Sequence, residues 1–281
     1  MIQMELDGVA FALKERFDFG FLAEYGKVFQ VLDDQDSGNI CFGMQKGDER
    51  FFIKFAGALT KRGCVPPETA IRNLKATVPI YQELKHENLI ELLETADAGG
   101  GFAMIFRWTD AVCLGKLYPE SRERFLQLPI EIKQQVFQDI QSFFLHVAQK
   151  GYVAIDFYDG SIMYDFASGK TLICDIDFFR RQPCLNDMGR MWGSSRFQSP
   201  EEYQLGADID EVTNVYTLGA TAFALFAHDS RQREDWPLND ALFETAAKAV
   251  SNEREKRFPS IAAFVHAWKE AMNVYSKEER Q

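Results

Sequence analysis

The chain has 281 residues, of which 46% are hydrophobic and 14% aromatic, so it can form substantial hydrophobic cores and is not expected to be disordered. A formal net charge of −11 argues against binding to nucleic acid or to an anionic membrane, because both favour a basic surface. Apolar runs also fall short of the ~18 residues that suggest a membrane span.

Five cysteines are spread along the chain without a CxxC pair. They are Cys41, Cys64, Cys113, Cys174 and Cys184. This spacing predicts neither a disulfide framework nor a zinc site. The first residues contain acids and lack the apolar segment and cleavage site of a secretory signal. We therefore expect a soluble, cytoplasmic protein with reduced thiols, and no feature predicts its oligomeric state.

The first part of the chain, up to about Asp110, favours β-strands after an N-terminal segment that we expect to be helical. The predicted strands are KVFQVL (27–32), NICFGMQ (39–45), RFFIKFAG (50–57) and the two arms of a hairpin within residues 91–108. Between them, residues 66–86 begin with prolines and place apolar side chains at helical spacing. This segment predicts a helix that Pro79 would bend.

The second part of the chain is predominantly helical. Residues 130–151 predict a long helix that ends at Gly151. Its apolar stripe is Ile132, Val136, Ile140, Phe143, Phe144 and Val147. Two short strands (161–165 and 171–177) and helices at 212–227, 240–250 and 260–272 follow. We predict an α+β protein with two lobes: residues 1–110 form a small five-stranded antiparallel lobe with one helix, and residues 111–281 a larger, mainly helical lobe.

Four segments resemble motifs of the protein kinase family and occur in the order that this family requires. They are FFIKFAG, VAIDFYDGS, TLICDIDFF and GSSRFQSPEE. The resemblance extends from about Val28 to about Trp268. It implies a kinase-like two-lobed fold and a bacterial-type serine/threonine kinase. Such an enzyme moves the γ-phosphoryl group of ATP, with Mg²⁺ or Mn²⁺, to a hydroxyl group of a protein substrate.

Lys54 and Asp156 are the predicted catalytic residues. Lys54 in FFIKFAG resembles the family's strand lysine, which contacts the α- and β-phosphates of ATP. Asp156 in VAIDFYDGS occupies the position of the carboxylate that orients the acceptor hydroxyl and accepts its proton. The stretch 152–165 places carboxylates among apolar residues. Because a buried carboxylate is costly unless it meets a cation or a metal, this stretch predicts a functional site.

The same loop departs from the family pattern at several positions. Its histidine and arginine positions are Ala154 and Ile155, its lysine position is Tyr158, and its metal-binding asparagine position is Ser161. The Ser161 hydroxyl could still bind Mg²⁺ weakly, with help from Asp159. The missing arginine normally meets a phosphate on the activation loop, so the resemblance implies a protein that does not need phosphorylation of that loop to become active and is either constitutively active or silent.

Two aspartates compete for the role of the family's main metal ligand. Asp177 precedes a phenylalanine, as the motif requires, whereas Asp175 lies nearer to the usual distance from the catalytic loop. In an extended chain both side chains would face the same side. We favour Asp177 as a ligand and keep Asp175 as a second one. Phe179 replaces the glycine of the motif.

The phosphate-covering loop and the neighbouring helix are also atypical. The segment DDQDSGN retains one glycine of GxGxxG, Gly38, as the candidate nucleotide-binding residue. Its acids Asp33, Asp34 and Asp36 would repel a triphosphate unless they point outward. The helix that should offer a glutamate to the catalytic lysine has Thr77 at that position.

Contacts to the adenine ring are expected from the linker segment FRWTD. Phe106 lies where the family sizes the back of the nucleotide pocket, and Arg107, Trp108 and Thr109 would offer peptide groups to the base. All four are therefore candidate ATP-binding residues.

The segment 193–201 resembles the substrate-side loop of the family and its anchor. The resemblance implies a buried structural ion pair between Glu201 and Arg257. Asn214 stands where an aspartate usually holds the catalytic-loop backbone. Serines at possible modification positions are Ser194, Ser195 and Ser199, although ordinary turn hydroxyls would explain them.

Two alternative functions remain open from the sequence. A non-catalytic interaction module, or pseudokinase, would explain the missing helix glutamate, the acidic loop and Ser161. A kinase-like small-molecule phosphotransferase would share the lysine and the two aspartates but would not require the pairing of SPEE with Arg257.

Overall fold

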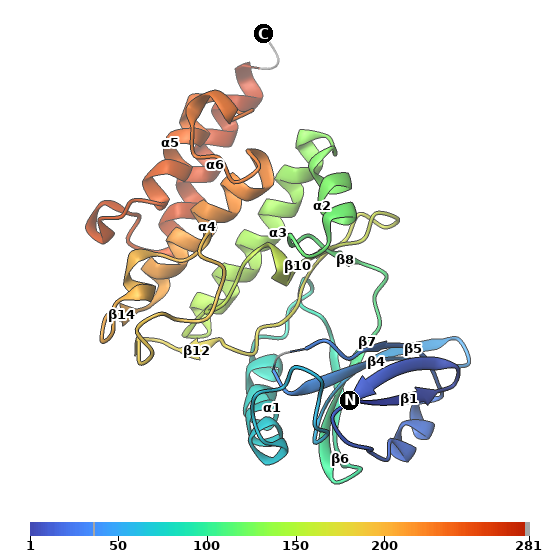
Figure 1. Cartoon of the computed structure of the whole chain (residues 1–281). Coiled ribbons are helices and arrows are strands. Elements are labelled where there is room, and N and C mark those ends of the chain that lie inside the picture. Colours follow the sequence, from blue (N-terminus) through green and yellow to red (C-terminus); the bar gives the residue numbers. More distant parts are fainter. Residues whose placement is uncertain (36, 279–281) are drawn as a thin grey trace. The chain divides into compact units, whose positions relative to one another are not determined.

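The computed structural model describes residues 1–35 and 37–278, with side chains up to Tyr275. The chain forms two compact units: Met1–Lys85 with Ile90–Asp110 form unit 1, and His86–Leu89 with Ala111–Gln281 form unit 2. Unit 1 holds a five-stranded antiparallel sheet and a helix, and unit 2 is mainly helical (Figure 1). The architecture is the predicted kinase-like, two-lobed α+β fold.

The sheet of unit 1 has the predicted antiparallel strands in the order β3-β4-β5-β7-β6. The strands are β3 (Lys27–Leu32), β4 (Asn39–Lys46), β5 (Glu49–Ala56), β6 (Leu92–Ala98) and β7 (Gly101–Arg107). In β4, six successive residues are buried, from Asn39 to Met44. A strand that is buried on both sides must be covered on both faces of its sheet.

Helix α1 (Pro67–Glu83) covers one face of this sheet, as its apolar spacing predicts. Its buried residues are Ala70, Leu74, Thr77 and Tyr81. The helix continues through Pro79 as a single element, although proline cannot donate the backbone hydrogen bond to the preceding turn. Packing against the sheet offsets that loss.

The prediction of an N-terminal helix is wrong. Strands β1 (Ile2–Leu6) and β2 (Val9–Leu13) form an antiparallel hairpin, and the short 3₁₀-helix η1 (Gly20–Tyr25) follows. Asp7 (φ 51°) and Gly8 (φ 87°) form the two-residue turn. An Asp-Gly pair favours such a hairpin turn, because both positions need positive φ. The Asp7 carboxylate also accepts a hydrogen bond of 2.8 Å from the Val28 backbone N–H, which ties the turn to β3.

The N-terminal segment covers the second face of the sheet. Phe19 lies at its centre, with ring centroids 5.0 Å from Phe42 and 5.9 Å from Phe55. Phe11 and Leu13 of β2 belong to the same buried cluster. The sheet therefore lies between α1 and the N-terminal segment, which explains why its central strands are apolar on both sides.

Unit 2 contains the predicted long helices and one short helix near its start (Figure 1). They are α2 (Pro119–Leu126), α3 (Ile130–Gln149), α4 (Glu211–Phe226), α5 (Asp240–Ala249) and α6 (Ile261–Glu278). Buried aromatic side chains, including Phe137, Phe226 and Trp268, join α3, α4 and α6. Helix α3 ends as predicted before Gly151 (φ 72°). Ile132 is 37% exposed and does not belong to the buried stripe, contrary to the prediction.

Short elements complete unit 2. The strand pairs are β10 (Ile162–Tyr164) with β11 (Thr171–Ile173) and with β8 (Val112–Cys113), β9 (Tyr152–Val153) with β12 (Arg180–Arg181), and β13 (Cys184–Leu185) with β14 (Asp208–Ile209). The 3₁₀-helices are η2 (Asp159–Ser161), η3 (Pro200–Tyr203), η4 (Arg233–Asp235) and η5 (Arg254–Lys256). The predicted strand 171–177 is wrong in its second half, because the chain leaves the extended conformation before Asp175 (φ 55°).

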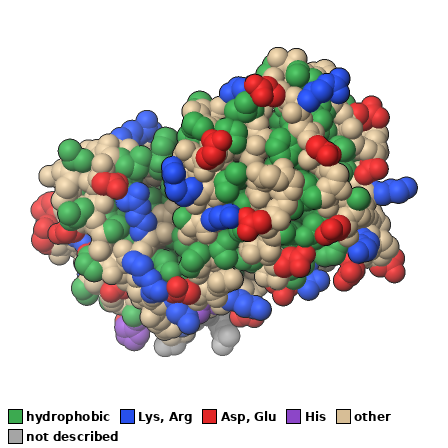
Figure 2. Space-filling model, turned by 90° about the horizontal axis from the view of Figure 1, so that it is seen from below, with side chains coloured by type: hydrophobic (Ala, Val, Ile, Leu, Met, Phe, Trp, Pro, Cys, Tyr) green, Lys and Arg blue, Asp and Glu red, His purple; other side chains and the backbone are tan. Residues whose placement is uncertain are grey.

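The five cysteines, all of which lie among the described residues, form no disulfide bond. Within residues 1–35 and 37–278, helices that are both long and apolar enough to cross a bilayer are absent. The face of the molecule in Figure 2 carries acidic and basic side chains in small, interspersed groups.

Candidate functional site

The predicted catalytic loop is fixed to helix α4 by Asn214. Its side-chain carbonyl accepts a hydrogen bond of 2.7 Å from the Ala154 N–H, and its amide group donates one of 2.7 Å to the Ala154 carbonyl. The predicted role of Asn214 is thus confirmed. An amide supplies both the donor and the acceptor that a peptide unit needs, whereas an ionised carboxylate could only accept.

Asp156 is held in a left-handed backbone conformation, with φ 62°. Such a conformation costs a non-glycine residue free energy and is concentrated at functional sites. The neighbouring side chains Ile155 and Phe157 are buried, and the Phe157 ring packs against Phe144 at 4.8 Å. Asp156 itself is half-buried. Its buried neighbours therefore anchor the strained residue on both sides.

The fully buried carboxylate of this stretch is Asp159 rather than Asp156. Asp159 is 1% exposed, and Arg122 and Arg196 each donate to one of its oxygens. These two guanidinium groups supply the cations that a buried carboxylate requires. The suggestion that Asp159 assists a metal ion is therefore not supported, since both of its oxygens are engaged.

The two candidate metal-binding aspartates differ in their surroundings. Asp175 is exposed and has φ 55°, Ile176 is fully buried, and Asp177 is half-buried in a turn. The expectation that both aspartates share one side of an extended strand is wrong, because this segment is not extended. Phe179, at the glycine position of the motif, is buried against Phe143 at 6.3 Å.

Tyr158 connects Asp156 and Asp175 electrostatically. Burial, together with the negative charges of Asp156 and Asp175, raises the pKa of the Tyr158 phenol to about 12. The Cys174 N–H donates a hydrogen bond of 2.9 Å to the Ser161 carbonyl, which joins the residue before Asp175 to the catalytic loop. The charges of both carboxylates held at positive φ thus act on the same phenol of unit 2.

Ser161 is 2% exposed, and its hydroxyl donates a long hydrogen bond of 3.5 Å to the Asp156 carbonyl. Among the residues that the structure describes, clusters of three or more His, Cys, Asp or Glu that could hold a metal are absent. Mg²⁺ usually binds through one or two carboxylates together with substrate phosphates, so such a cluster is not required. The exposed carboxylate of Asp175 suits this mode of binding better than the buried hydroxyl of Ser161.

The predicted ion pair between Glu201 and Arg257 is confirmed. Arg257 Nη1 and Nη2 lie 2.6 and 2.9 Å from the two carboxylate oxygens of Glu201, and the Arg257 side chain is fully buried. Thr213 Oγ1 also donates to Glu201 at 3.0 Å. Burial alone would raise the pKa of Glu201, but the hydrogen bond and charge of Arg257 hold it below its usual value.

The serines of the segment 193–201 differ in accessibility. Ser199 is fully buried, and its N–H and hydroxyl donate to the Glu202 carboxylate at 2.7 and 2.9 Å. These bonds cap η3. Ser194 is half-buried and Ser195 exposed. Ser199 is therefore a structural hydroxyl, as ordinary turn chemistry suggests.

In unit 1, Lys54 lies on β5 opposite Met104 of β7 and is half-buried. Thr77 of α1 faces this position, with its hydroxyl 3.3 Å from the Met104 sulfur and donating to the Leu74 carbonyl at 2.8 Å. A threonine thus packs against the strand partner of the lysine at the position where the family has a glutamate.

The acids of the DDQDSGN loop interact within unit 1. Asp33 accepts a hydrogen bond of 2.8 Å from the Ala12 N–H, and Asp34 pairs with Arg62 at 2.7 Å. Asp36 lies outside the described residues. Gly38 has φ 84°, and a Cβ there would lie 3.1 Å from the Val65 side chain. The glycine is thus required by its backbone and by close packing.

The linker segment is well ordered by contacts inside unit 1. Phe106 is 1% exposed and packs against Tyr81 at 5.1 Å. The N–H groups of Arg107 and Trp108 donate to the carbonyls of Glu91 and Arg50 at 2.9 and 3.1 Å. Two of the peptide donors expected for adenine are therefore engaged with protein carbonyls, and Thr109 is half-buried.

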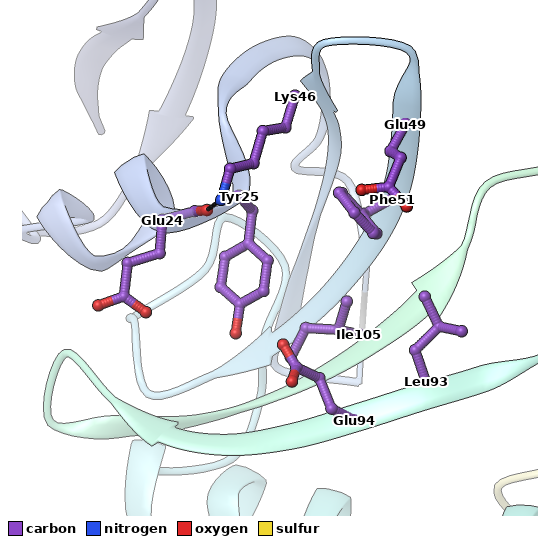
Figure 3. Close-up of a pocket in the computed structure, with 8 residues that line it drawn as sticks. All are labelled: Glu24, Tyr25, Lys46, Glu49, Phe51, Leu93, Glu94 and Ile105. Carbon is purple, nitrogen blue, oxygen red and sulfur yellow. Dashed lines mark hydrogen bonds between the residues drawn. The ribbon is translucent and has the colours of Figure 1, made fainter.

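A pocket with a volume of about 590 Å³ lies elsewhere in unit 1 (Figure 3). Its lining consists of Glu24, Tyr25, Lys46, Glu49, Phe51, Leu93, Glu94 and Ile105, none of which is a predicted site residue. Burial and a hydrogen bond to Glu94 raise the pKa of Tyr25 to about 12. This pocket is therefore separate from the predicted catalytic and nucleotide-binding residues.

The charged residues around Asp159 were not predicted from the sequence. They are Arg122, Arg196 and Asp229. The ion pairs that these residues and Asp159 form join positions 33 to 107 residues apart along the chain. Short-range spacing offers no signal for such contacts. The one available hint is the composition of the stretch 152–165, which indicates that some carboxylate there needs a cation.

Comparison with known proteins identifies a distant relative. The serine/threonine-protein kinase srb10 of Schizosaccharomyces pombe is 22% identical over 257 residues, which cover 86% of this chain and 68% of that protein. No protein-family model matches the chain. The distant homology supports membership of the protein kinase superfamily, in agreement with the two-lobed α+β fold.

Proposed function

We propose that the chain is a serine/threonine protein kinase-like phosphotransferase that moves the γ-phosphoryl group of Mg-ATP to a hydroxyl group of a protein. The observation that carries this proposal is the paired strain at Asp156 and Asp175. Both carboxylates are held at positive φ, at 62° and 55°, and both act on the Tyr158 phenol. Backbone strain of this kind is retained where it serves a site.

In the proposed reaction, Asp156 orients the acceptor hydroxyl and accepts its proton as the oxygen attacks the γ-phosphorus. The bond from that phosphorus to the bridging oxygen of ADP breaks. Catalysis of this kind depends mostly on placement and on charge stabilisation. The hydrogen bonds between Asn214 and Ala154 keep the loop in place, so that the carboxylate requires little reorganisation.

Asp175 is the proposed main Mg²⁺ ligand, and Asp177 is a secondary candidate. Bound Mg²⁺ would neutralise phosphate charge. The exposed carboxylate of Asp175 and its electrostatic link to the Asp156 loop favour it over the half-buried Asp177. Lys54 is proposed to position phosphates through its ammonium group, and Gly38 and residues 106–109 to contribute to nucleotide binding in unit 1.

A non-catalytic interaction module, or pseudokinase, is the second candidate. It is favoured by Thr77, which stands at the helix position where the family has a glutamate and contacts Met104, and by the burial of Ser161. The engaged N–H groups of Arg107 and Trp108 point in the same direction. Such a module would bind its partner without transferring phosphate.

The test is transfer of label from γ-labelled ATP to a generic protein or to the chain itself, with Mg²⁺ and with Mn²⁺. We expect label transfer by the wild type. We expect Lys54→Ala to lose it and Asp175→Asn to lose more of it than Asp177→Asn. Transfer only to a small alcohol would instead indicate a small-molecule phosphotransferase.

Thermal unfolding with ATP and Mg²⁺ separates the module from an enzyme whose substrate was missed. A ligand at ~100 times its Kd stabilises a protein by ~2.7 kcal/mol. A wild-type chain that neither transfers label nor is stabilised by millimolar nucleotide would contradict the proposal and support the module.

A further inference from the structure

Four charged residues of unit 2 form a closed ring of ion pairs, here called the arginine–aspartate ring. Its members are Arg122 on α2, Asp159 in η2, Arg196 in the segment 193–201 and Asp229 after α4. Arg196 donates to Asp159 and to Asp229 at 2.7 Å each. Arg122 donates to Asp159 and, at 3.2 Å, to Asp229. Each member thus contacts two others.

The ring is largely withdrawn from water. The side chains of Asp159, Arg122, Asp229 and Arg196 are 1%, 14%, 19% and 22% exposed. Charges at this depth are costly when unpaired, and removal of one partner leaves the others uncompensated. Lys116 adds a third cation near Asp229, at 3.2 Å. The ring therefore links the four chain segments that carry its members, and a shift of one segment would break ion pairs with two others.

The backbone around Asp229 supports a fixed role for this residue. His228 and Asp229 both have positive φ, at 53° and 73°, although neither is a glycine. The Asp229 N–H donates to the Phe223 carbonyl at 3.1 Å, which fixes the turn to the end of α4. Strain of this type persists where surrounding contacts determine it. Here it directs the Asp229 carboxylate to both arginines.

Arg196 joins the ring to the segment that resembles the substrate-side loop. Its guanidinium group also lies 4.9 Å from the Phe197 ring, and its carbonyl accepts a hydrogen bond of 3.3 Å from Arg231. Phe197 in turn packs near Tyr158, with ring centroids 6.5 Å apart. The cation is thus on the segment and the anion, Asp159, is on the loop that carries Asp156.

We propose that the arginine–aspartate ring holds the segment 193–201 on the catalytic loop in its working position without covalent modification, with Arg196 as a positioning residue. This inference rests on the proposed phosphotransferase function. Because Arg196 of the segment pairs with Asp159 of the loop, the attraction between the two comes from unmodified side chains and requires no added phosphate. A phosphate added at the exposed Ser195 would compete with Asp159 and Asp229 for Arg196, and would loosen the segment rather than order it.

The test compares three variants of the full chain after phosphatase treatment, with intact mass confirming that phosphate is absent. Arg196→Met removes the bridging cation, and Arg196→Lys keeps the charge but cannot form a fork to both aspartates. Arg190→Met is the matched control, because Arg190 is an exposed arginine of the neighbouring segment outside the ring. Arg196→Lys also serves if Arg196→Met fails to fold.

The first readout is amide hydrogen exchange of peptides covering residues 190–204, which requires no activity. Hydrogen bonds to charged groups stabilise enough that we expect about 10-fold faster exchange in Arg196→Met, a smaller increase in Arg196→Lys and none in Arg190→Met. Unchanged exchange in both Arg196 variants would contradict the proposal that the ring holds the segment 193–201 on the catalytic loop, whether or not the chain transfers phosphate.

The second readout applies once label transfer is observed. We expect the phosphate-free wild type to remain active, and Arg196→Met to raise the KM for the protein acceptor about 10-fold while the KM for ATP is unchanged. A general loss of structure would change both constants. If removal of phosphate abolishes wild-type activity, the inference is wrong even though the proposed function stands.

Discussion

The buried ion pair between Glu201 and Arg257 leads to a quantitative prediction for unit 2. The Arg257 side chain is fully buried and Glu201 is 9% exposed. Truncation of Glu201 to alanine leaves the guanidinium with two backbone acceptors, the carbonyls of Ser251 at 2.8 Å and Val212 at 3.4 Å. Removal of one partner of a buried pair typically costs ~3–5 kcal/mol. We expect a loss of this size in the free energy of unfolding.

Arg254 provides the matched control for this variant. It also donates to Glu201, at 3.0 Å, but its side chain is 27% exposed. Partly exposed pairs contribute little, so Arg254→Ala should cost about 1 kcal/mol or less. The double variant Glu201→Ala with Arg257→Ala should cost about 2–3 kcal/mol less than the sum of the single variants, because the two residues are directly coupled.

The assay is urea unfolding followed by tryptophan fluorescence. Trp108 lies in unit 1, whereas Trp192, Trp236 and Trp268 lie in unit 2. A background with Trp108→Phe therefore makes fluorescence report unit 2 alone, even if the units unfold in separate steps. Additive effects of the two single variants, or equal costs for Glu201→Ala and Arg254→Ala, would refute the reasoning.

Three further predictions concern single side chains. Burial raises the pKa of Glu202 from 4.5 to about 7, so the wild type loses stability as the pH rises from about 4.5 to about 7. In urea unfolding, the stability of Glu202→Gln relative to the wild type should therefore be greater at pH 8 than at pH 5, by up to about 3 kcal/mol. Asn214→Ala leaves both peptide groups of Ala154 without their partner and should cost about 2–4 kcal/mol by the same assay, whereas an unchanged midpoint would contradict this role. Gly38→Ala should destabilise unit 1 by about 1 kcal/mol more than Gly47→Ala, whose φ is also positive but whose Cβ would meet open space; equal thermal shifts would contradict the packing argument.

The elements with strong local periodicity could be predicted from the sequence. Strand β5 and helix α3 follow from alternation and helical spacing of apolar residues, and the structure places both within one or two residues of the expected bounds. Asn214 and the pair of Glu201 with Arg257 were predictable for a different reason. They belong to motifs whose order along the chain is preserved, so long-range contacts could be inferred from the resemblance.

The N-terminal hairpin was missed although its signal was present. Apolar residues alternate with period two in the first six residues, and Asp7-Gly8 is a strong hairpin turn. The prediction of a helix did not take this period or this turn into account. The second cover of the sheet was missed with it.

The arginine–aspartate ring could not be predicted in physical terms. Its contacts join residues 33 to 107 positions apart, and no local rule relates them. Composition showed that the stretch 152–165 holds a buried carboxylate, but not which one. Asp156 and Asp159 are separated by a turn that directs the second inward and leaves the first half-buried, and only the three-dimensional structure distinguishes them.

The most direct test of the account is the rate of label transfer from γ-labelled ATP by Asp156→Asn. Asp165→Asn is the control, since that aspartate belongs to the same stretch but caps the exposed turn after β10. A general base contributes about 10²–10⁴-fold, so we predict a loss of this size in Asp156→Asn, with nucleotide-induced thermal stabilisation retained and Asp165→Asn near the wild type. Wild-type transfer by Asp156→Asn would contradict the proposed role of the catalytic loop.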